Sequence, residues 1–160
     1  MGDAKKAIGF YEQALIIARE IGDWRGEGNA LGNLGNAYAA LGDARKAIEF
    51  YEQALIIAQE IGDRRGEGTV LGSLGNAYAD LGDAQKAIEF YEQDLFIARE
   101  TGDRRGEGIV LFNMGLSLYN LEEKDRAIEF VKQALIIYEA IESPYAERAR
   151  NKLKEWDALQ

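Results

Sequence analysis

The sequence of 160 residues contains no cysteine, no histidine and a single proline. Without cysteine there is no disulfide, no thiolate nucleophile and no cysteine-based metal site. Without histidine the chain also lacks the commonest general base near neutral pH and the commonest metal ligand. These absences exclude most catalytic constellations, so we expect no enzymatic activity, no cofactor and no metal.

Positive charge and long apolar runs are also scarce. Lys and Arg number 19 against 28 Asp and Glu, which gives a formal net charge of −9. Proteins that bind nucleic acid neutralise phosphates with basic side chains, so we expect no nucleic-acid partner. The longest apolar runs, such as 54–58, are too short to cross a bilayer, and the N-terminus has no apolar signal segment. We therefore expect no membrane partner and a cytoplasmic location.

The dominant feature of the sequence is an internal repeat of about 40 residues. GDWRGEG at 22–28 returns as GDRRGEG at 62–68 and 102–108, and LGDARKAIEFYEQALIIA at 41–58 returns at 81–98 with few changes. The chain therefore divides into a half repeat (2–21), three full repeats (22–61, 62–101 and 102–141) and a C-terminal capping helix (143–159). The third repeat diverges after Met114.

Each repeat contains two helical patterns. In the second half of the first repeat, the apolar side chains recur at the spacing of one helix face; they are Ala47, Ile48, Tyr51, Ala54, Leu55 and Ala58. Leu31, Leu34, Tyr38 and Leu41 form a matching stripe in the first half. Gly-Asp pairs separate the helices, since glycine can end one helix and aspartate can cap the next. This predicts an all-α fold of about eight antiparallel helices.

These positions resemble the tetratricopeptide repeat (TPR) pattern. Leu31, Leu34, Gly35 and Tyr38, followed by Ala47, Tyr51 and Ala54, fit it, with leucine in place of its usual tryptophan. The period is similar to the longer repeats of Pins-type proteins and of many prokaryotic arrays. Leu118 and Asp94 depart from the pattern, which has tyrosine and alanine there. The resemblance implies a right-handed superhelical solenoid that binds proteins in a concave groove.

The glycines of GDRRGEGTVLGSLG, residues 62–75, could be mistaken for a phosphate-binding loop. Such a loop follows a buried strand, whereas the segment before it has helical periodicity, and the loop occurs three times. We therefore expect no nucleotide site. Gly75 matches the TPR glycine at which two helices approach closely. Gly72 would face the groove, and two interpretations stay open: room for a ligand, or a shallow groove without function.

The resemblance also implies an inner stripe on the first helix of each repeat. In the first repeat it consists of Arg25, Asn29, Gly32, Asn33, Asn36 and Ala39. In the second it consists of Arg65, Thr69, Gly72, Ser73, Asn76 and Ala79. In the third it consists of Arg105, Ile109, Phe112, Asn113, Leu116 and Tyr119.

Two polar features of this stripe suggest contacts with a partner. Arg25, Arg65 and Arg105 share one position and could bind acidic groups, or each could pair with a nearby Asp or Glu of its own chain. The asparagines at 33, 36, 76 and 113 could donate to and accept from a peptide backbone, or could simply form a solvated polar face.

The third repeat replaces the small groove residues with Ile109, Phe112, Leu116 and Tyr119. These side chains could hold an apolar anchor of a partner, which we favour, or receive the chain's own C-terminal helix. Asp94 is exceptional because it stands where the repeat before has Ala54. A buried carboxylate needs a partner, so either the site is partly exposed or Arg126 or Asn113 reaches it.

Both ends suggest self-association. The first helix, 2–21, has no preceding partner helix, and its apolar face includes Ile8, Tyr11, Leu15 and Ile16. The segment PYAERARNKLKEWDALQ is one amphipathic helix with Ala149, Leu153 and Trp156 on its inner face. Unpaired helices at both ends could allow a homo-oligomer, or could indicate an excerpt of a longer array.

The sequence thus favours a non-enzymatic module that binds a protein or peptide segment, acidic in part and with an apolar anchor. The alternative is a structural spacer or oligomerisation unit with no ligand of its own. A carboxylate enzyme centred on Asp94 ranks third, because no other catalytic group accompanies it.

Overall fold

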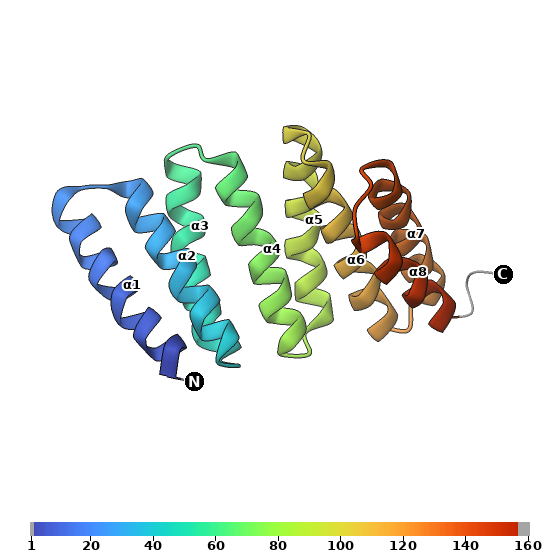
Figure 1. The fold of residues 1–160 in the computed structure, drawn as a ribbon, viewed down its shortest axis with the longest axis horizontal. Coiled ribbons are helices and arrows are strands. Elements are labelled where there is room, and N and C mark those ends of the chain that lie inside the picture. Colours follow the sequence, from blue (N-terminus) through green and yellow to red (C-terminus); the bar gives the residue numbers. More distant parts are fainter. Residues whose placement is uncertain (1, 157–160) are drawn as a thin grey trace.

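A computed structural model describes residues 2–156, with side chains from residue 5 onward, and this part of the chain consists of helices without any strand (Figure 1). The helices are α1 (Gly2–Ile21), α2 (Trp24–Ala40), α3 (Ala44–Glu60), α4 (Arg64–Asp80), α5 (Ala84–Thr101), α6 (Arg104–Asn120), α7 (Lys124–Ala140) and α8 (Tyr145–Glu155). The predicted all-α fold with eight helices is confirmed.

The helices stand side by side in chain order, from α1 at one end of the molecule to α7 and α8 at the other (Figure 1). Each packs on the next, and α4 also touches both α2 and α6. The first helices of the three repeats are therefore direct neighbours, so their side chains can form one continuous surface.

The predicted Gly-Asp pairs form the first five turns between helices. Five glycines end helices with positive φ, from +68° to +79°: Gly22, Gly42, Gly62, Gly82 and Gly102. The aspartate that follows each accepts a hydrogen bond from a backbone N–H three residues on, as Asp63 does from Gly66 at 3.0 Å. Such caps satisfy N–H groups that the first helical turn leaves free.

The turn between α6 and α7 in the third repeat lacks both the glycine and the capping aspartate. Glu122 takes the glycine position with φ of +63°, and the cap residue Glu123 makes no side-chain capping bond. Glu142, before α8, also has positive φ. A non-glycine residue is disfavoured in this region, so the divergent turns are less favourable than those they replace.

Within each of the first two full repeats, a tyrosine of the second helix lies flat against a glycine of the first. Tyr51 covers Gly35 and Tyr91 covers Gly75, and any Cβ on either glycine would overlap the tyrosine ring. Both tyrosines are almost fully buried, at 4% and 2% exposure. The predicted close approach at Gly75 is confirmed, and it depends on the missing side chain.

The C-terminal helix closes the core of the third repeat. Ala149 and Leu153 of α8 are fully buried, and Trp156 stacks on Tyr119 with ring centroids 4.1 Å apart. The opposite end is open. Ile17 of α1 is 56% exposed, although its equivalents Ile57, Ile97 and Ile137 are 4–7% exposed.

The Tyr51–Gly35 contact predicts opposite effects for one substitution at two positions of α2. Gly35→Ala should lower the free energy of unfolding by about 2 kcal/mol because the new methyl overlaps the Tyr51 ring. Gly32→Ala is the matched control, since no atom lies within 4 Å of its Cβ position. It should raise that free energy by about 0.5–1 kcal/mol through helix propensity. Urea denaturation followed by circular dichroism measures both, and equal effects would contradict the assignment.

Candidate functional site

A hollow of about 290 Å³ lies between α4, α5 and the start of α6. It brings together five residues of the predicted groove, namely Arg65, Gly72, Asn76, Arg105 and Ile109. Thr69 and Ser73 of the predicted inner stripe also line it. A smaller hollow of about 50 Å³ holds Arg25 and Asn29 one repeat earlier.

The three arginines of the stripe differ in their surroundings. Arg25 forms an ion pair with Asp63 at 3.7 Å, the cap of the next repeat, which is the self-pairing alternative. Arg65 and Arg105 make no ion pair within the part of the chain that the structure describes. The Arg105 guanidinium lies 5.8 Å from the Tyr145 ring centroid. Two unpaired cations therefore line the hollow.

Three of the predicted groove asparagines form hydrogen bonds within the protein itself. Asn36 accepts a hydrogen bond from the Tyr51 hydroxyl at 2.8 Å, and Asn76 accepts one from Tyr91 at 2.7 Å. Asn113 donates to Asn76 at 3.1 Å across the repeat boundary. The expectation that these carbonyl oxygens are free for a partner is therefore wrong for Asn36 and Asn76, since the adjacent tyrosines need an acceptor where they emerge from the core.

Asn29 and Asn33 are exposed on α2, and neither forms a side-chain hydrogen bond among the described residues. They keep the full donor and acceptor capacity of an amide.

Two of the four apolar side chains of the third repeat, Ile109 and Phe112, line a small hollow of about 120 Å³ together with Tyr138, Tyr145 and Arg148. Phe112 is 2% exposed, and the guanidinium carbon of Arg148 lies 4.8 Å from the centroid of the Phe112 ring. Ile109 is half-buried and lines the hollow between α4, α5 and α6.

Leu116 and Tyr119 are half-buried and pack against the core of the third repeat, and Tyr119 stacks on Trp156. The favoured expectation is wrong for Phe112 and Tyr119, because Arg148 and Trp156 cover them as the alternative proposed, whereas for Leu116 it stays a prediction.

Asp94 of α5 reaches the hollow through the space that two glycines of α4 leave. A Cβ at Gly72 would lie 2.6 Å from its Oδ2, and one at Gly68 would lie 3.1 Å from its Oδ1. The room above Gly72 therefore holds a side chain of this protein. Neither expected partner reaches Asp94: Arg126 pairs with Glu123, and Asn113 bonds to Asn76.

The environment of Asp94 disfavours its ionised form. Burial raises the pKa of the Asp94 carboxyl to about 7, and the negative charge of Asp103 acts in the same direction. Removing a carboxylate from water without a compensating donor penalises the charged state.

The sequence prediction confined the groove to the first helices and so missed the contribution of α5. Asp94, Ile97, Ala98 and Thr101 of this helix line the hollow, together with Asp103 from the turn that follows it. The signal in the sequence was the substitution of aspartate for alanine at 94, since the two opposing glycines occur in the first repeat as well, as Gly28 and Gly32. Helical spacing alone cannot show that these residues face one another.

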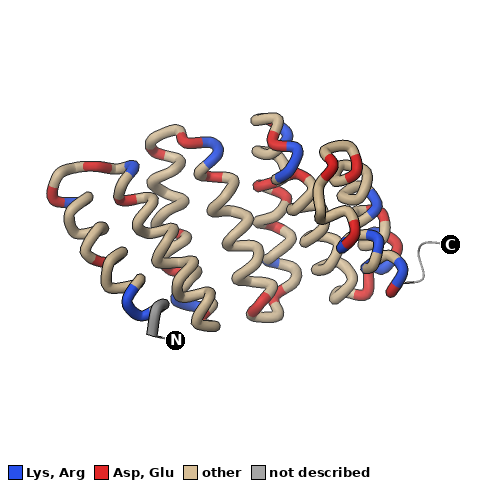
Figure 2. The backbone as a smooth tube through the Cα atoms, viewed as in Figure 1, with Lys and Arg blue, Asp and Glu red and all other residues tan. Residues whose placement is uncertain are grey.

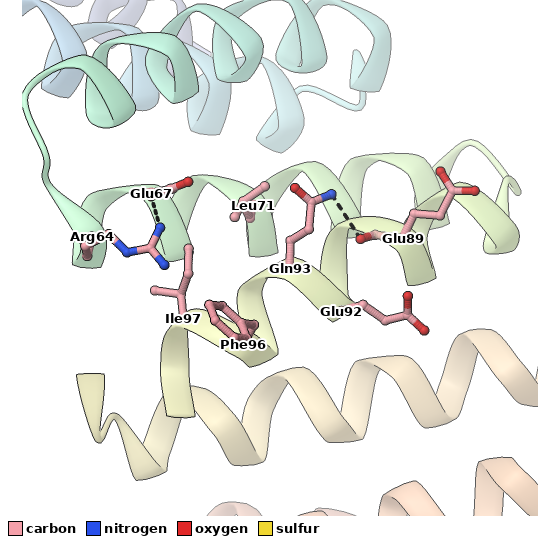
Figure 3. Close-up of a pocket in the computed structure, with 8 residues that line it drawn as sticks. All are labelled: Arg64, Glu67, Leu71, Glu89, Glu92, Gln93, Phe96 and Ile97. Atoms are coloured by element: carbon pink, nitrogen blue, oxygen red, sulfur yellow. Dashed lines mark hydrogen bonds and ion pairs between the residues drawn. The ribbon is translucent and has the colours of Figure 1, made fainter. Parts of the chain in front are cut away.

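A second hollow, of about 560 Å³, lies along α4 and α5 and is lined by the residues drawn in Figure 3, of which only Ile97 also lines the first hollow. Its charged residue Glu67 is held by Arg64 at 2.5 Å and by Gln59 at 3.1 Å, and its wall residue Phe96 is 66% exposed. Glu107 repeats this arrangement with Arg99 and Arg104. The buried carboxylate of this hollow, Glu67, is thus paired within the protein, whereas Asp94 in the other hollow is not.

Charged residues lie mainly at the helix ends and on α8, whereas the middle of α4 is free of them (Figure 2). In residues 2–156 no group of three or more potential ligands gathers in a metal-binding arrangement. None of the described helices is both long enough and apolar enough to span a bilayer.

Comparisons with known proteins place these repeats in context. The family model described as tetratricopeptide repeat matches residues 1–60, 30–95 and 66–140. No curated protein matches the sequence.

Solved structures show the same fold at low sequence identity. BtubC (BKLC) from P. vanneervenii is 23% identical with a TM-score of 0.79; the match covers 94% of this chain and 64% of BtubC. A putative kinesin light chain of Podosopora anserina with nearly identical TPR-like repeats is 20% identical with a TM-score of 0.79; the match covers 98% of this chain and 79% of that chain. The tetratricopeptide repeat sensor of a signal transduction ATPase from Pyrococcus horikoshii is 23% identical with a TM-score of 0.78, covering 98% of this chain and 23% of that protein.

The pKa of Asp94 predicts a specific pH dependence of stability. The folded-state pKa of about 7 lies above the ordinary 3.8, so between these values the folded chain binds the extra proton and the free energy of unfolding falls as pH rises. Asp94→Asn removes this loss. The variant should match the wild type near pH 4 and exceed it by about 2 kcal/mol at pH 8, after allowance for solvent at the carboxyl.

Denaturant titrations from pH 4 to pH 8 measure this difference, and Asp94→Ala should show the same pH trend. A stability difference that does not change with pH would refute the assigned environment of Asp94.

Proposed function

This chain belongs to the tetratricopeptide repeat family, and from this premise we propose that it binds a protein or peptide segment in the groove between α4, α5 and α6. Proteins of this family generally act in protein–protein interaction. The observation that carries the proposal is the hollow itself, which holds two arginines without an ion pair in a chain of net charge −9. The 40-residue subtype and a cytoplasmic location belong to the same proposal and rest on the sequence.

Acidic groups of the partner would meet Arg65 and Arg105. A guanidinium presents a planar fork of donors that can bind a carboxylate through two parallel hydrogen bonds. Arg25 would extend the row, since its pair with Asp63 is loose at 3.7 Å and its side chain is 71% exposed.

The groove walls suit an extended backbone. Thr69 and Ser73 donate their hydroxyl protons to carbonyls one turn earlier in α4, which leaves their oxygens as acceptors. Asn76 accepts with its carbonyl but retains amide donors, and Asn29 and Asn33 continue the polar surface on α2. Ile109 offers an apolar contact at the opposite edge.

Charge reversal in the groove tests this proposal. A peptide-display library selected on the wild-type protein supplies the probe peptides. The double variant Arg65→Glu and Arg105→Glu should weaken their binding at least tenfold, because it replaces two favourable charges with two unfavourable ones. Fluorescence anisotropy measures the affinity, and circular dichroism checks that the helix content is unchanged.

Arg45→Glu is the control, because Arg45 is exposed at the start of α3 and lines neither hollow of the groove. Peptides that bind all these variants equally would show that the groove is not the binding site.

A second candidate function, self-association, is favoured by the open face of α1. Ile17 is 56% exposed where the equivalent isoleucines of the other repeats are buried by a neighbouring helix. A second copy of the chain could cover this face. The other end is less suited, since α8 already packs against α6 and α7.

Two glutamate substitutions of equally exposed isoleucines test self-association. Ile17→Glu should raise the dimer dissociation constant at least tenfold by removing buried apolar area. Ile56→Glu should have little effect, because position 56 is 55% exposed and its equivalents Ile16, Phe96 and Ile136 are exposed as well. Light scattering over a concentration series measures the mass, and a monomer at every concentration would refute this function.

A further inference from the structure

Asp94 and the two glycines opposite it form a set found only in the second of the three full repeats. The equivalent positions of Asp94 are Ala54 and Ala134, which are 2% and 0% exposed. In the first repeat nothing lies within 4 Å of a Cβ at Gly32, the equivalent of Gly72, and in the third Phe112 fills that place. Among the three equivalent positions 54, 94 and 134, only position 94 carries a carboxylate.

The carboxylate of Asp94 lacks the partners that the other buried carboxylates have. Glu67 and Glu107 are each held by an arginine. Asp94 accepts no hydrogen bond and forms no ion pair with any residue from 5 to 156. No polar side-chain atom of this region is both fully buried and unsatisfied, so the oxygens of Asp94 are open to the hollow.

The charged and titratable groups around Asp94 come from every element that packs near it. Arg65 lies on α4, the neutral phenol of Tyr91 on α5, and Asp103 and Arg105 at the start of α6. Neither arginine approaches within ion-pair distance, and the negative charge of Asp103 repels an ionised Asp94. The Asp94 carboxylate therefore faces the groove without a counterion among the described residues.

We propose that Asp94 is the counterion for a basic side chain, lysine or arginine, of the segment bound in this groove. The proposal rests on the proposed function and adds a specificity element to it. An ammonium or guanidinium supplies both the charge and the hydrogen-bond donors that the carboxylate lacks. Flanking acidic residues of the same segment would meet Arg65 and Arg105, so the groove selects a basic residue between acidic ones.

A metal ion is a poorer occupant, because Asp94 offers one carboxylate and no group of three ligands gathers within the described residues. An acidic side chain is excluded at this position by repulsion from Asp94 and Asp103. Arg65 and Arg105 lie in the same hollow and remain available to acidic side chains of the partner.

Cation binding to Asp94 has a pH signature. Only the ionised carboxylate attracts a cation, and its pKa is about 7 in the free protein. The affinity should therefore rise about tenfold between pH 6 and pH 8, and binding near neutral pH should release a proton. A segment held only by Arg65 and Arg105 would not gain affinity over this range.

A small cation tests the site without a partner. Butylammonium chloride, compared with sodium chloride at equal ionic strength, should shift the amide resonances of Gly68 and Gly72 at pH 8 and lower the pKa of Asp94 measured by carbon NMR. Asp94→Asn keeps the shape and should abolish the amide shifts. Absence of shifts in the wild type, or equal shifts in the variant, would overturn the proposal.

The display-selected peptides test the site in its functional setting. Replacing the basic residue of a peptide with glutamine should weaken binding to the wild type at least tenfold and change binding to Asp94→Asn by less than twofold. Peptides that depend on Arg65 and Arg105 but are indifferent to both changes would refute the role of Asp94 and leave the groove function standing. Peptides that ignore Arg65, Arg105 and Asp94 alike would refute both.

Discussion

The contact between a tyrosine of one helix and a glycine of its partner holds this architecture together. Tyr91 lies against Gly75 and Tyr51 against Gly35, so each helix pair is as close as a bare backbone permits. Because the ring passes over the glycine, its hydroxyl emerges beside the next residue, Asn76 or Asn36, and bonds to it. One packing contact thus fixes the spacing of the helices and the polar floor of the groove.

The carboxylate of Asp94 in the groove of the second repeat lowers the stability of the fold at neutral pH. Gly68 and Gly72 lower the helix propensity of α4, and Asp94 is poorly solvated in the space that they leave. An alanine at 94, as in the other full repeats, would avoid the burial of charge, and the first repeat combines such an alanine, Ala54, with the same two glycines. Residues that reduce stability without a structural return are typical of sites that bind a ligand.

In the third repeat a large apolar side chain fills the position that a glycine occupies in the second repeat. Phe112 occupies the place of Gly72, and α8 packs over it with Arg148 above the ring and Trp156 on Tyr119. Apolar side chains that would otherwise be exposed at the end of the array become core. This closed end contrasts with α1, whose Ile17 remains exposed for want of a neighbouring helix.

The sequence by itself determined the repeat, the helices, the Gly-Asp turns and the close approach at Gly75, because periodicity, capping and the missing Cβ are local properties. Only the tertiary structure decided which side chains occupy the space between helices. Asp94 and Gly72 are far apart in the chain, and so are Trp156 and Tyr119; their meeting depends on the angle and depth at which helices pack. For that reason Phe112 and Tyr119 of the predicted apolar anchor proved to be covered by Arg148 and Trp156, and the unpartnered carboxylate of Asp94 proved to face the groove.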